Sequence, residues 1–362
     1  MSENFTREYD AMQRALALAA TPGVPLHPNP RVGCVLLADD GTVVGEGHHR
    51  GAGTPHAEID ALAQAGEAAR GATAVVTLEP CNHTGRTGPC SQALIEADVR
   101  RVVVAQRDPN PVASGGLEVL AAAGIEVDAG LLEEDARAVN TAWTFAHEHG
   151  RPYVTWKFAT TLDGRSAASD GSSRWVTSPA ARRDSHLLRA LCDTMLVGTN
   201  TVAVDDPLLT VRDAGGAPLP EQPLRVVMGE RDLAKDRRVF NDDAATVQLR
   251  THDPLEALRS LYRDHDRHHV FFEGGPTLAA AFLQAGVVDE VVTYLAPLML
   301  GSGTSAVGPL GIGSIGEALA FELVNTLVLM PGPDDEETEA INLRLTLRPR
   351  PRTSARSTLK GY

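Results

Sequence analysis

The chain has 362 residues, which exceeds the usual size of a single hydrophobic core, so we expect two domains. Hydrophobic residues make up 43% of the chain and aromatic residues 4%, a balance typical of a globular protein. The formal net charge is -14, and this disfavours nucleic-acid binding because proteins that bind phosphate backbones usually carry a basic face. A small molecule is the favoured partner.

No stretch of the chain is apolar over the length that spans a bilayer, and acidic residues stand where a signal peptide would be basic. We therefore expect a cytoplasmic protein without a membrane segment. In a reducing compartment, four cysteines favour metal binding or catalysis over a disulfide framework. Cys34 and Cys192 lie in apolar patterns and are expected to be small core residues, which leaves Cys81 and Cys90.

The first half of the chain alternates helical and strand patterns. Apolar residues recur with helical spacing over residues 6–20, and the segment VGCVLLADDGTVVGEG predicts two strands joined at Asp40-Gly41. Further helices and strands follow in turn, and the last helix of this half is predicted over about 132–146. The alternation favours a three-layer αβα sandwich.

A break in the helical pattern at Gly150-Arg151-Pro152 marks the predicted domain boundary, which separates domains over 1–150 and 151–348. The second domain repeats the α/β pattern, with strands near 153–160, 194–198, 225–229, 268–273, 288–296, 321–330 and 341–348 and helices near 178–191, 254–263 and 276–285. The basic segment 349–362 lacks apolar periodicity and predicts a mobile, solvated tail, with an interaction arm as the alternative.

The two cysteines of TLEPCNHTGRTGPC, residues 77–90, could form a disulfide or hold a metal. His56-Ala57-Glu58 opens a predicted helix, and Cys81 and Cys90 each follow a proline. One histidine and two cysteines supply three zinc ligands and leave a fourth position for water, which is the pattern of a catalytic site. Zinc lowers the pKa of its water to about 7, and Glu58 is placed to move protons between that water and a leaving amine.

This arrangement is the H-x-E…P-C…C signature of zinc-dependent nucleobase deaminases. Structural zinc or two core thiols are alternatives for each motif alone, but the motifs together favour catalytic zinc. The loop between the cysteines is longer than the PCxxC of nucleic-acid and free-nucleoside deaminases, and it carries His83 and Arg86. Both residues are suited to a phosphate, and a merely solvated loop is equally compatible with their types.

Several segments resemble the bifunctional deaminase–reductase family of riboflavin biosynthesis, RibD. HPNPRVGCV, GEGHHRGAGTPHAE, GATAVVTLEPCNHTGRTGPC and RDPNP look like its first domain. The similarity continues to about residue 348 through KFATTLDGRSA, SRWVTSPAARRDSHLLRA, TVAVDDPLLTVR and FFEGGPTLAAAFLQAGVVDEVVTYLAPLMLG. It implies an N-terminal cytidine-deaminase-like three-layer αβα domain and a C-terminal dihydrofolate-reductase-like α/β domain.

The resemblance implies a zinc-dependent deamination of a diamino ribosylaminopyrimidine 5'-phosphate, followed by an NADPH-dependent reduction of its ribosyl group to ribityl. His56, Cys81 and Cys90 match the zinc ligands and Glu58 the proton shuttle. The implied substrate contacts of the deaminase are Asn29 and His49 on the pyrimidine and ribose side and His83 and Arg86 at the phosphate. The family often has Lys where Arg86 stands, and Arg keeps the charge.

In the second domain, Phe271-Phe272-Glu273 runs into Gly274-Gly275-Pro276-Thr277, a junction that can bring backbone N–H groups to a pyrophosphate. Alone it is a weak signal, since ordinary strand–helix turns look alike. The resemblance implies NADPH contacts at Ala159, Trp175, Thr201, Asp205, Gly275, Pro276, Thr277, Leu278, Ala279, Ala280 and Ala281. It implies substrate contacts at Lys157, Ser173, Arg189, Leu209, Arg212 and Glu273, with Arg189 and Arg212 suited to the phosphate.

Asp163 resembles a family feature near the active site and has no assigned chemical role. Gly229-Glu230 stands where the family often has Asp-Ser, and a carboxylate near the 2'-phosphate weakens the expected preference for NADPH over NADH. Two rival functions are a tRNA or free-base deaminase with a non-catalytic second domain and a zinc-stabilised binding module. A homo-oligomer, dimer or higher, is implied by the resemblance alone.

Overall fold

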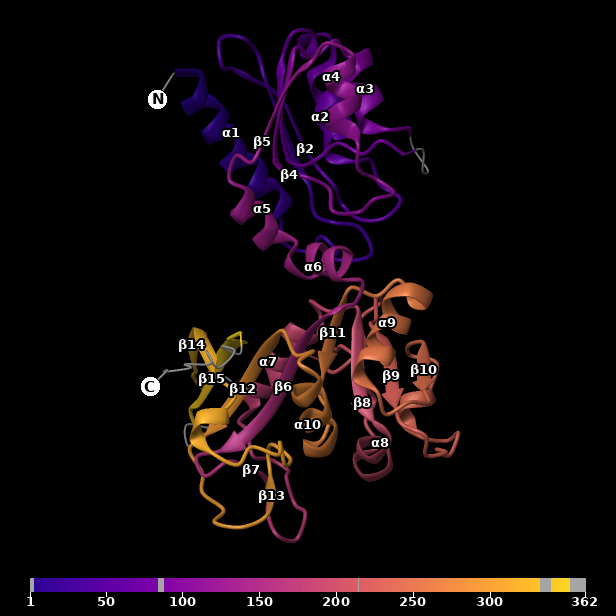
Figure 1. The fold of residues 1–362 in the computed structure, drawn as a ribbon, viewed down its shortest axis with the longest axis vertical. Coiled ribbons are helices and arrows are strands. Elements are labelled where there is room, and N and C mark those ends of the chain that lie inside the picture. The colour runs from indigo at the N-terminus through magenta and orange to yellow at the C-terminus, as the bar shows by residue number, and fades with distance from the viewer. Residues whose placement is uncertain (1–2, 84–87, 214, 333–339, 352–362) are drawn as a thin grey trace, which may run out of the picture. The chain divides into compact units, whose positions relative to one another are not determined.

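The computed structural model describes residues 3–83, 88–213, 215–332 and 340–351. The chain forms two compact units that divide between Arg151 and Pro152 (Figure 1). Within the described ranges, no helix is both long and apolar enough to cross a membrane.

The first unit is a three-layer sandwich around a five-stranded sheet of order β2-β1-β3-β4-β5. Helices α2, α3 and α4 pack on one face and α1 and α5 on the other, because alternate strand residues point to opposite faces (Figure 1). The elements are α1 (Glu3–Ala19), β1 (Gly33–Leu37), β2 (Val43–His48), α2 (Ala57–Ala65), a 3-10 turn (Gly66–Ala69), β3 (Thr73–Leu78), α3 (Cys90–Glu96), β4 (Arg101–Gln106), α4 (Gly116–Ala122), β5 (Glu126–Ala129), α5 (Glu133–Val139) and α6 (Thr141–His149). The predicted sandwich, first helix and hairpin are confirmed.

The single helix predicted over 132–146 is wrong, because the chain forms α5 and α6 with a break at Asn140. The buried Asn140 side chain accepts a hydrogen bond from the Arg31 amide and donates one to the Arg31 carbonyl, each at 2.8 Å. This contact joins residues 109 positions apart, so helical periodicity contains no signal for it. It ties the helical segment to the loop that carries Asn29.

The second unit is built on an eight-stranded sheet of order β10-β9-β8-β11-β6-β12-β15-β14, in which β15 and β14 are antiparallel to their neighbours. Helices α9 and α10 pack on one face, and α7 and α8 on the other. The elements are β6 (Tyr153–Thr161), β7 (Arg165–Ala167), α7 (Pro179–Arg189), β8 (Thr194–Gly198), α8 (Thr199–Asp205), β9 (Leu224–Met228), a 3-10 turn (Arg238–Phe240), β10 (Thr246–Leu249), α9 (Pro254–His265), β11 (His269–Phe272), α10 (Pro276–Ala285), β12 (Glu290–Ala296), β13 (Thr304–Ser305), a 3-10 turn (Ile315–Glu317), β14 (Phe321–Leu329) and β15 (Asn342–Pro349).

Some short elements of the second unit were not predicted from the sequence patterns. Helix α8 and strands β7, β10 and β13 were not predicted, because they have no run of buried residues, whereas the equally short β8, β9 and β11 do. The longer strands and helices lie close to their predicted ranges. The carboxyl ends of the parallel strands lie at one edge of the sheet, which is the usual place for ligand binding in such folds.

Helix α2 lies directly on strand β2 because the strand presents a glycine to it. A Cβ atom added at Gly47 would lie 2.2 Å from the Ala57 carbonyl oxygen and 2.5 Å from the Ala61 nitrogen. Only glycine allows this close approach. The strand thereby sets the position of the first turn of α2, next to His56.

Replacement of Gly47 by alanine should destabilise the first unit. The added methyl group forces α2 away from β2, and we expect a loss of about 2 kcal/mol in the free energy of unfolding, as is typical of overpacking. Urea unfolding of Gly47→Ala and of the wild type measures this. The control is Gly313→Ala, where the nearest atom to an added Cβ is 3.9 Å away. Equal stability of wild type and Gly47→Ala would contradict the packing argument.

Candidate active sites

The three predicted metal ligands of the first unit lie together. His56 immediately precedes α2, Cys81 follows β3, and Cys90 begins α3. The His56 Nδ1 atom lies 3.2 Å from the Cys90 Sγ atom and 3.6 Å from the Cys81 Sγ atom. All four cysteines of the chain are described and free, so the loop is not closed by a disulfide.

This donor set fits zinc. With Zn–N and Zn–S bonds of about 2.0 and 2.3 Å, tetrahedral geometry separates a nitrogen and a sulfur ligand by about 3.5 Å, close to the distances found here. Hydrogen bonds from Cys90 and then His56 lower the pKa of Cys81 to about 4, so this sulfur is a thiolate. The backbone N–H of Cys90 also donates to the Cys81 sulfur at 3.4 Å. The starts of two helices and the segment after β3 thus supply a zinc-type ligand set.

Glu58 lies in the first turn of α2, next to the ligand cluster. Its side chain is buried, and burial raises its pKa to about 7. A carboxyl group with this pKa can both accept and donate a proton at neutral pH. The position and the protonation behaviour both suit the predicted proton shuttle.

Asn29 and His49 form one hydrogen-bonded unit beside His56. The buried His49 Nδ1 lies 3.0 Å from the Pro55 carbonyl, which can only accept, so Nδ1 carries the proton. The His49 Nε2 atom then accepts from the Asn29 amide nitrogen at 3.0 Å. The His49 and His56 rings meet edge to face at 5.2 Å between centroids. Burial lowers the pKa of His49, which keeps it neutral.

The structure describes only one of the two residues predicted to contact the phosphate in the deaminase. His83 is half-buried, and its Nδ1 atom has no hydrogen-bond partner in the described part of the chain. Arg86 lies outside the described residues. Both assignments stay predictions.

Sequence reasoning missed Glu79, which organises the loop between β4 and α4. Its buried carboxylate accepts backbone N–H bonds from Asp108 and Gly115 at 3.0 Å and from Leu117 at 3.2 Å. This attaches the loop to the residue two positions before Cys81. An acidic residue directly after a fully buried strand was the available signal, because such a carboxylate needs partners.

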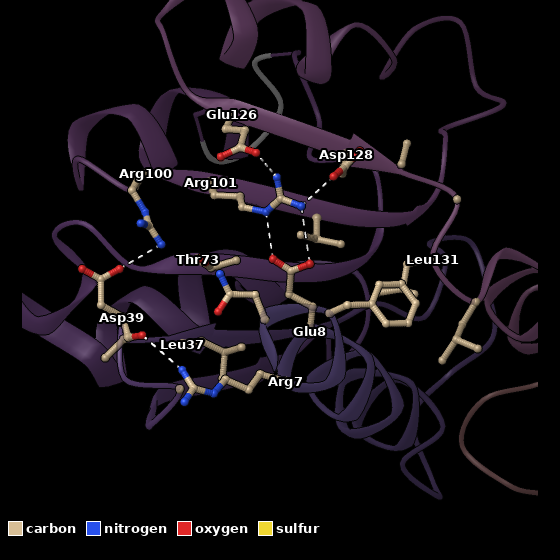
Figure 2. A pocket seen from close by; sticks show the side chains of 18 residues that line it. Arg7, Glu8, Leu37, Asp39, Thr73, Arg100, Arg101, Glu126, Asp128 and Leu131 are labelled. Carbon is tan, nitrogen blue, oxygen red and sulfur yellow. Dashed lines mark hydrogen bonds and ion pairs between the residues drawn. The ribbon is translucent and has the colours of Figure 1, made fainter. Parts of the chain in front are cut away.

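A polar cavity of about 890 Å³ lies at the other end of this sheet (Figure 2). It is lined by Thr73 at the start of β3, whereas Cys81 follows the end of that strand, on the order of 20 Å away at the usual rise per residue. Figure 2 shows that Arg101 is enclosed by carboxylates, which belong to Glu8, Glu126 and Asp128. The charged groups that line the cavity pair with one another. The cavity is separate from the metal ligands.

The second unit has its charged cluster where β11 ends. The register pairs Phe272 with Trp156, so Glu273 and Lys157 come together on neighbouring strands. Glu273 binds Arg189 of α7 through two contacts, at 2.5 and 3.3 Å, and lies 3.5 Å from the Lys157 Nζ atom. Three of the predicted substrate residues therefore meet at one point.

The electrostatics of this cluster favour an anionic ligand. Burial alone would raise the pKa of Glu273, but Arg189 and then Lys157 outweigh it and lower the pKa to about 2. Burial, Arg189 and Arg212 lower the pKa of the neighbouring His186 to about 4, which places Arg212 in the same cationic environment. Together these groups carry three positive charges against one carboxylate, a suitable balance for a phosphate.

The Gly274-Gly275 junction gives α10 an open start. A Cβ atom at Gly274 would lie 2.1 Å from the Phe272 ring, so the tight turn requires glycine. Among described residues, no side chain caps the first N–H groups of α10, nor those of α8. Both helices begin at the carboxyl ends of adjacent parallel strands, where such N–H groups can bind phosphate.

The remaining predicted contacts are spread over this edge. Ala159 lies on β6, Thr201 and Asp205 on α8, and Gly275 to Leu278 at the start of α10. The side chains of Ala279 and Leu209 are buried in the core, and their assignments as ligand contacts stay predictions. Ser173 and Trp175 lie on an exposed segment, where the Arg182 guanidinium lies 4.5 Å from the Trp175 ring centroid.

Asp163 holds two loops together. It accepts hydrogen bonds from the Thr161 hydroxyl at 2.6 Å, from the Leu300 amide at 3.2 Å and from the Gly301 amide at 2.7 Å. These bonds lower the pKa of Asp163 to about 2. Its role in the structure is therefore to fix the loop that follows β12.

Several curated proteins and solved structures similar to this chain carry the same name, RibD. The riboflavin biosynthesis protein RibD of Mycobacterium tuberculosis is 50% identical over 309 residues, which cover 85% of this chain and 90% of that protein. The Escherichia coli protein of the same name is 42% identical, over 89% and 96% of the two chains. The structure of Acinetobacter baumannii RibD, form 2, matches with a TM-score of 0.86 at 37% identity, over 96% of this chain and all of that one (100%).

The fold and the ligand cluster define a zinc-dependent deaminase joined to a reductase. The family model for the cytidine and deoxycytidylate deaminase zinc-binding region matches residues 6–106, and the RibD C-terminal domain model matches residues 152–332. The chain belongs to the RibD family, the bifunctional deaminases and reductases of riboflavin biosynthesis. This membership disfavours the tRNA deaminase and binding-module alternatives.

The acid stability of the second unit should depend on Glu273. Because its folded pKa, about 2, is below the ordinary value of 4.5, its contribution is complete above about pH 4.5 and is lost as the pH falls towards 2. We expect the stability difference between wild type and Glu273→Gln to shrink as the pH falls from 5 to 3. Urea unfolding at each pH measures it. A difference that stays constant would contradict the ion-pair interpretation.

Proposed function

We propose that residues 1–150 deaminate a diamino ribosylaminopyrimidine 5'-phosphate and that residues 151–348 reduce its ribosyl group with NADPH. The observation that carries the first step is the three-ligand cluster beside the buried Glu58. A similar solved structure, from Thermotoga maritima, is named a diaminohydroxyphosphoribosylaminopyrimidine deaminase and 5-amino-6-(5-phosphoribosylamino)uracil reductase, with a TM-score of 0.81 and 32% identity. Its name supports this choice of substrate.

In the deaminase, His56, Cys81 and Cys90 would hold the zinc ion. Zinc at such a site makes water acidic enough to ionise near neutral pH. Glu58 accepts the proton of the attacking water and delivers it to the departing amine, a role that its pKa of about 7 permits in both directions. Asn29 and His49 orient the pyrimidine, because their hydrogen bond fixes both polar groups beside His56. His83 and Arg86 contact the phosphate.

In the reductase, Lys157 and Glu273 hold the ribosyl group, and Arg189 and Arg212 attract its phosphate. NADPH supplies the hydride. The uncapped N–H groups at the start of α10, which follows Gly275, would hold the cofactor's pyrophosphate, and Thr201 of α8 would contact the cofactor beside it. Because the Glu273 carboxylate is ionised, it can accept hydrogen bonds from sugar hydroxyl groups.

Two arginines lie near Glu230, and one of them, Arg231, supports NADPH as the cofactor. Glu230 is exposed at the end of β9, and its backbone carbonyl accepts a bond from Arg250 at 3.0 Å. The adjacent Arg231 donates to the Asn200 side chain in α8 at 3.4 Å. Arg250 also pairs with the Asp232 carboxylate at 2.5 Å, so the charge of Arg231 is the one that offsets the Glu230 carboxylate. The four free cysteines fit the reducing environment of the cytoplasm, where we place the enzyme.

We also propose that the chain forms a homo-oligomer through β14. This strand is the outer edge of the large sheet, and it exposes the apolar side chains of Leu323, Val324, Leu327 and Val328. A long apolar edge is a template for pairing with another strand, and a second copy of the chain presents a matching edge.

Replacement of Leu327 by glutamate should dissociate this oligomer. The charge would be buried on association and would repel its counterpart. Analytical ultracentrifugation should show the wild type as a dimer or larger and Leu327→Glu as a smaller species. The control is Leu187→Glu, at an exposed leucine of α7. Wild type sedimenting as a monomer would refute the oligomer.

The proposed function is tested by a coupled assay with the diamino substrate. We expect ammonia release and NADPH oxidation in the wild type, and a strong reduction of both with the diamino substrate in Glu58→Gln. This variant keeps all three zinc ligands, so we expect full zinc content but a loss of deamination of at least about a hundredfold, because proton transfer is removed.

The deaminated substrate, supplied directly, provides the internal control. Glu58→Gln should reduce it at the wild-type rate, since Glu58 lies in the other unit. Ammonia release by the wild type without NADPH oxidation would remove the reductase half of the proposal. A fully active Glu58→Gln would show that another group moves the proton.

A further inference from the structure

The ammonium group of Lys157 is held only loosely by its carboxylate partner. Its Nζ atom lies 3.5 Å from Glu273, whereas Arg189 binds both oxygens of the same carboxylate more closely. A lysine side chain has four rotatable bonds and about 2 kcal/mol of rotamer entropy, so one weak contact leaves the ammonium poorly fixed. A second constraint is needed if Lys157 is to meet the substrate in one position.

The face of the Tyr294 ring supplies this constraint. Lys157 Nζ lies 5.5 Å from the ring centroid, within the range of a cation–π contact. The strand register explains the contact: Val292 is opposite Lys157, and Tyr294 is opposite Ala159, so the two side chains are diagonal neighbours on one face. The small side chain of Ala159 leaves room for the ring.

The Tyr294 ring is itself locked in place. Its side chain is 1% exposed, and its hydroxyl donates to the Asp184 carboxylate of α7 at 2.6 Å. Arg344 of β15 donates to both oxygens of that carboxylate, at 2.9 and 3.0 Å. Burial raises the pKa of Tyr294, so the phenol keeps its proton and remains a donor.

Helix α7 connects both constraints on Lys157. Asp184 fixes the tyrosine on one side, and Arg189, just over one turn later, fixes Glu273 on the other. The ammonium therefore lies between a ring and a carboxylate that are attached to the same helix. All of these side chains are at most 20% exposed, so little water competes for them.

We propose that Tyr294 is a positioning residue of the reductase, which holds the Lys157 ammonium in its working position through the face of a ring anchored by Asp184 and Arg344. The inference rests on the proposed reduction of the ribosyl group. The two parts of the tyrosine side chain have different roles. The ring face contacts the Lys157 ammonium, and the hydroxyl group holds the ring in place through Asp184.

The test compares three variants in the reductase reaction with the deaminated substrate and NADPH. Tyr294→Leu removes the ring, and kcat/KM should fall on the order of tenfold, as expected for loss of a partly buried cation–π contact. Tyr294→Phe keeps the ring, and its kcat/KM should remain close to that of the wild type. Tyr153→Leu removes a buried tyrosine ring from the beginning of β6 and should leave kcat/KM near that of the wild type.

Further measurements exclude a general loss of structure. The deaminase rate of the same chain should be unchanged in all variants, because that site lies in the other unit. The NADPH dissociation constant, measured by fluorescence, should also be unchanged in Tyr294→Leu, whereas the KM for the substrate or kcat changes. In a Lys157→Met background, Tyr294→Leu should have no further effect on kcat/KM.

The outcomes distinguish this inference from the proposed function. If wild type does not oxidise NADPH with the deaminated substrate, the proposed reduction itself fails. If wild type is active and Tyr294→Leu matches it, the positioning role is wrong. Equal losses in Tyr294→Leu and Tyr294→Phe, or an additive loss in the Lys157→Met background, would also overturn it.

Discussion

The deaminase site depends on the close approach of one imidazole nitrogen and two sulfur atoms, which come from the starts of two helices and from the segment after β3. Strand β3 delivers Cys81, and α3 begins with Cys90, so the Cys90 amide can donate to the Cys81 sulfur. Helix α2 must lie directly on β2 to bring His56 to the same point, and Gly47 permits this contact. The sandwich thus acts as the scaffold for a metal centre whose ligands come from three separate segments.

The second unit orders its site through a cluster of charged side chains. Glu273 draws Arg189 of α7 and Lys157 of β6 to the carboxyl end of β11, and its pKa falls because these cations surround it. Truncating one partner would leave an uncompensated charge in a partly buried place, which is costly. The ion pairs of the cluster therefore stabilise the unit, and its excess positive charge is suited to an anionic ligand.

Much of the fold and the metal site was predictable from the sequence, because the signals are local. The H-x-E tripeptide and the two Pro-Cys pairs each sit next to a strand or helix whose period is visible, so His56, Glu58, Cys81 and Cys90 could be found together. Glu79 and Asn140 form hydrogen bonds to backbone groups about 30 to 110 positions away. Such contacts could not be predicted from the spacing of apolar residues, because that spacing depends only on neighbouring positions. The Tyr294–Asp184–Arg344 group joins residues up to 160 positions apart, for the same reason.

The two buried glutamates show why residue type alone does not define a role. Burial dominates at Glu58 and raises its pKa to about 7, whereas Arg189 and Lys157 overcome burial at Glu273 and lower its pKa to about 2. The first carboxyl group can exchange a proton at neutral pH, and the second remains a fixed negative charge. The sequence offers the same side chain in both places, and only the neighbours brought in by the fold give one carboxyl group a pKa near neutral and keep the other ionised. An account of either site must therefore begin with what surrounds the carboxyl group.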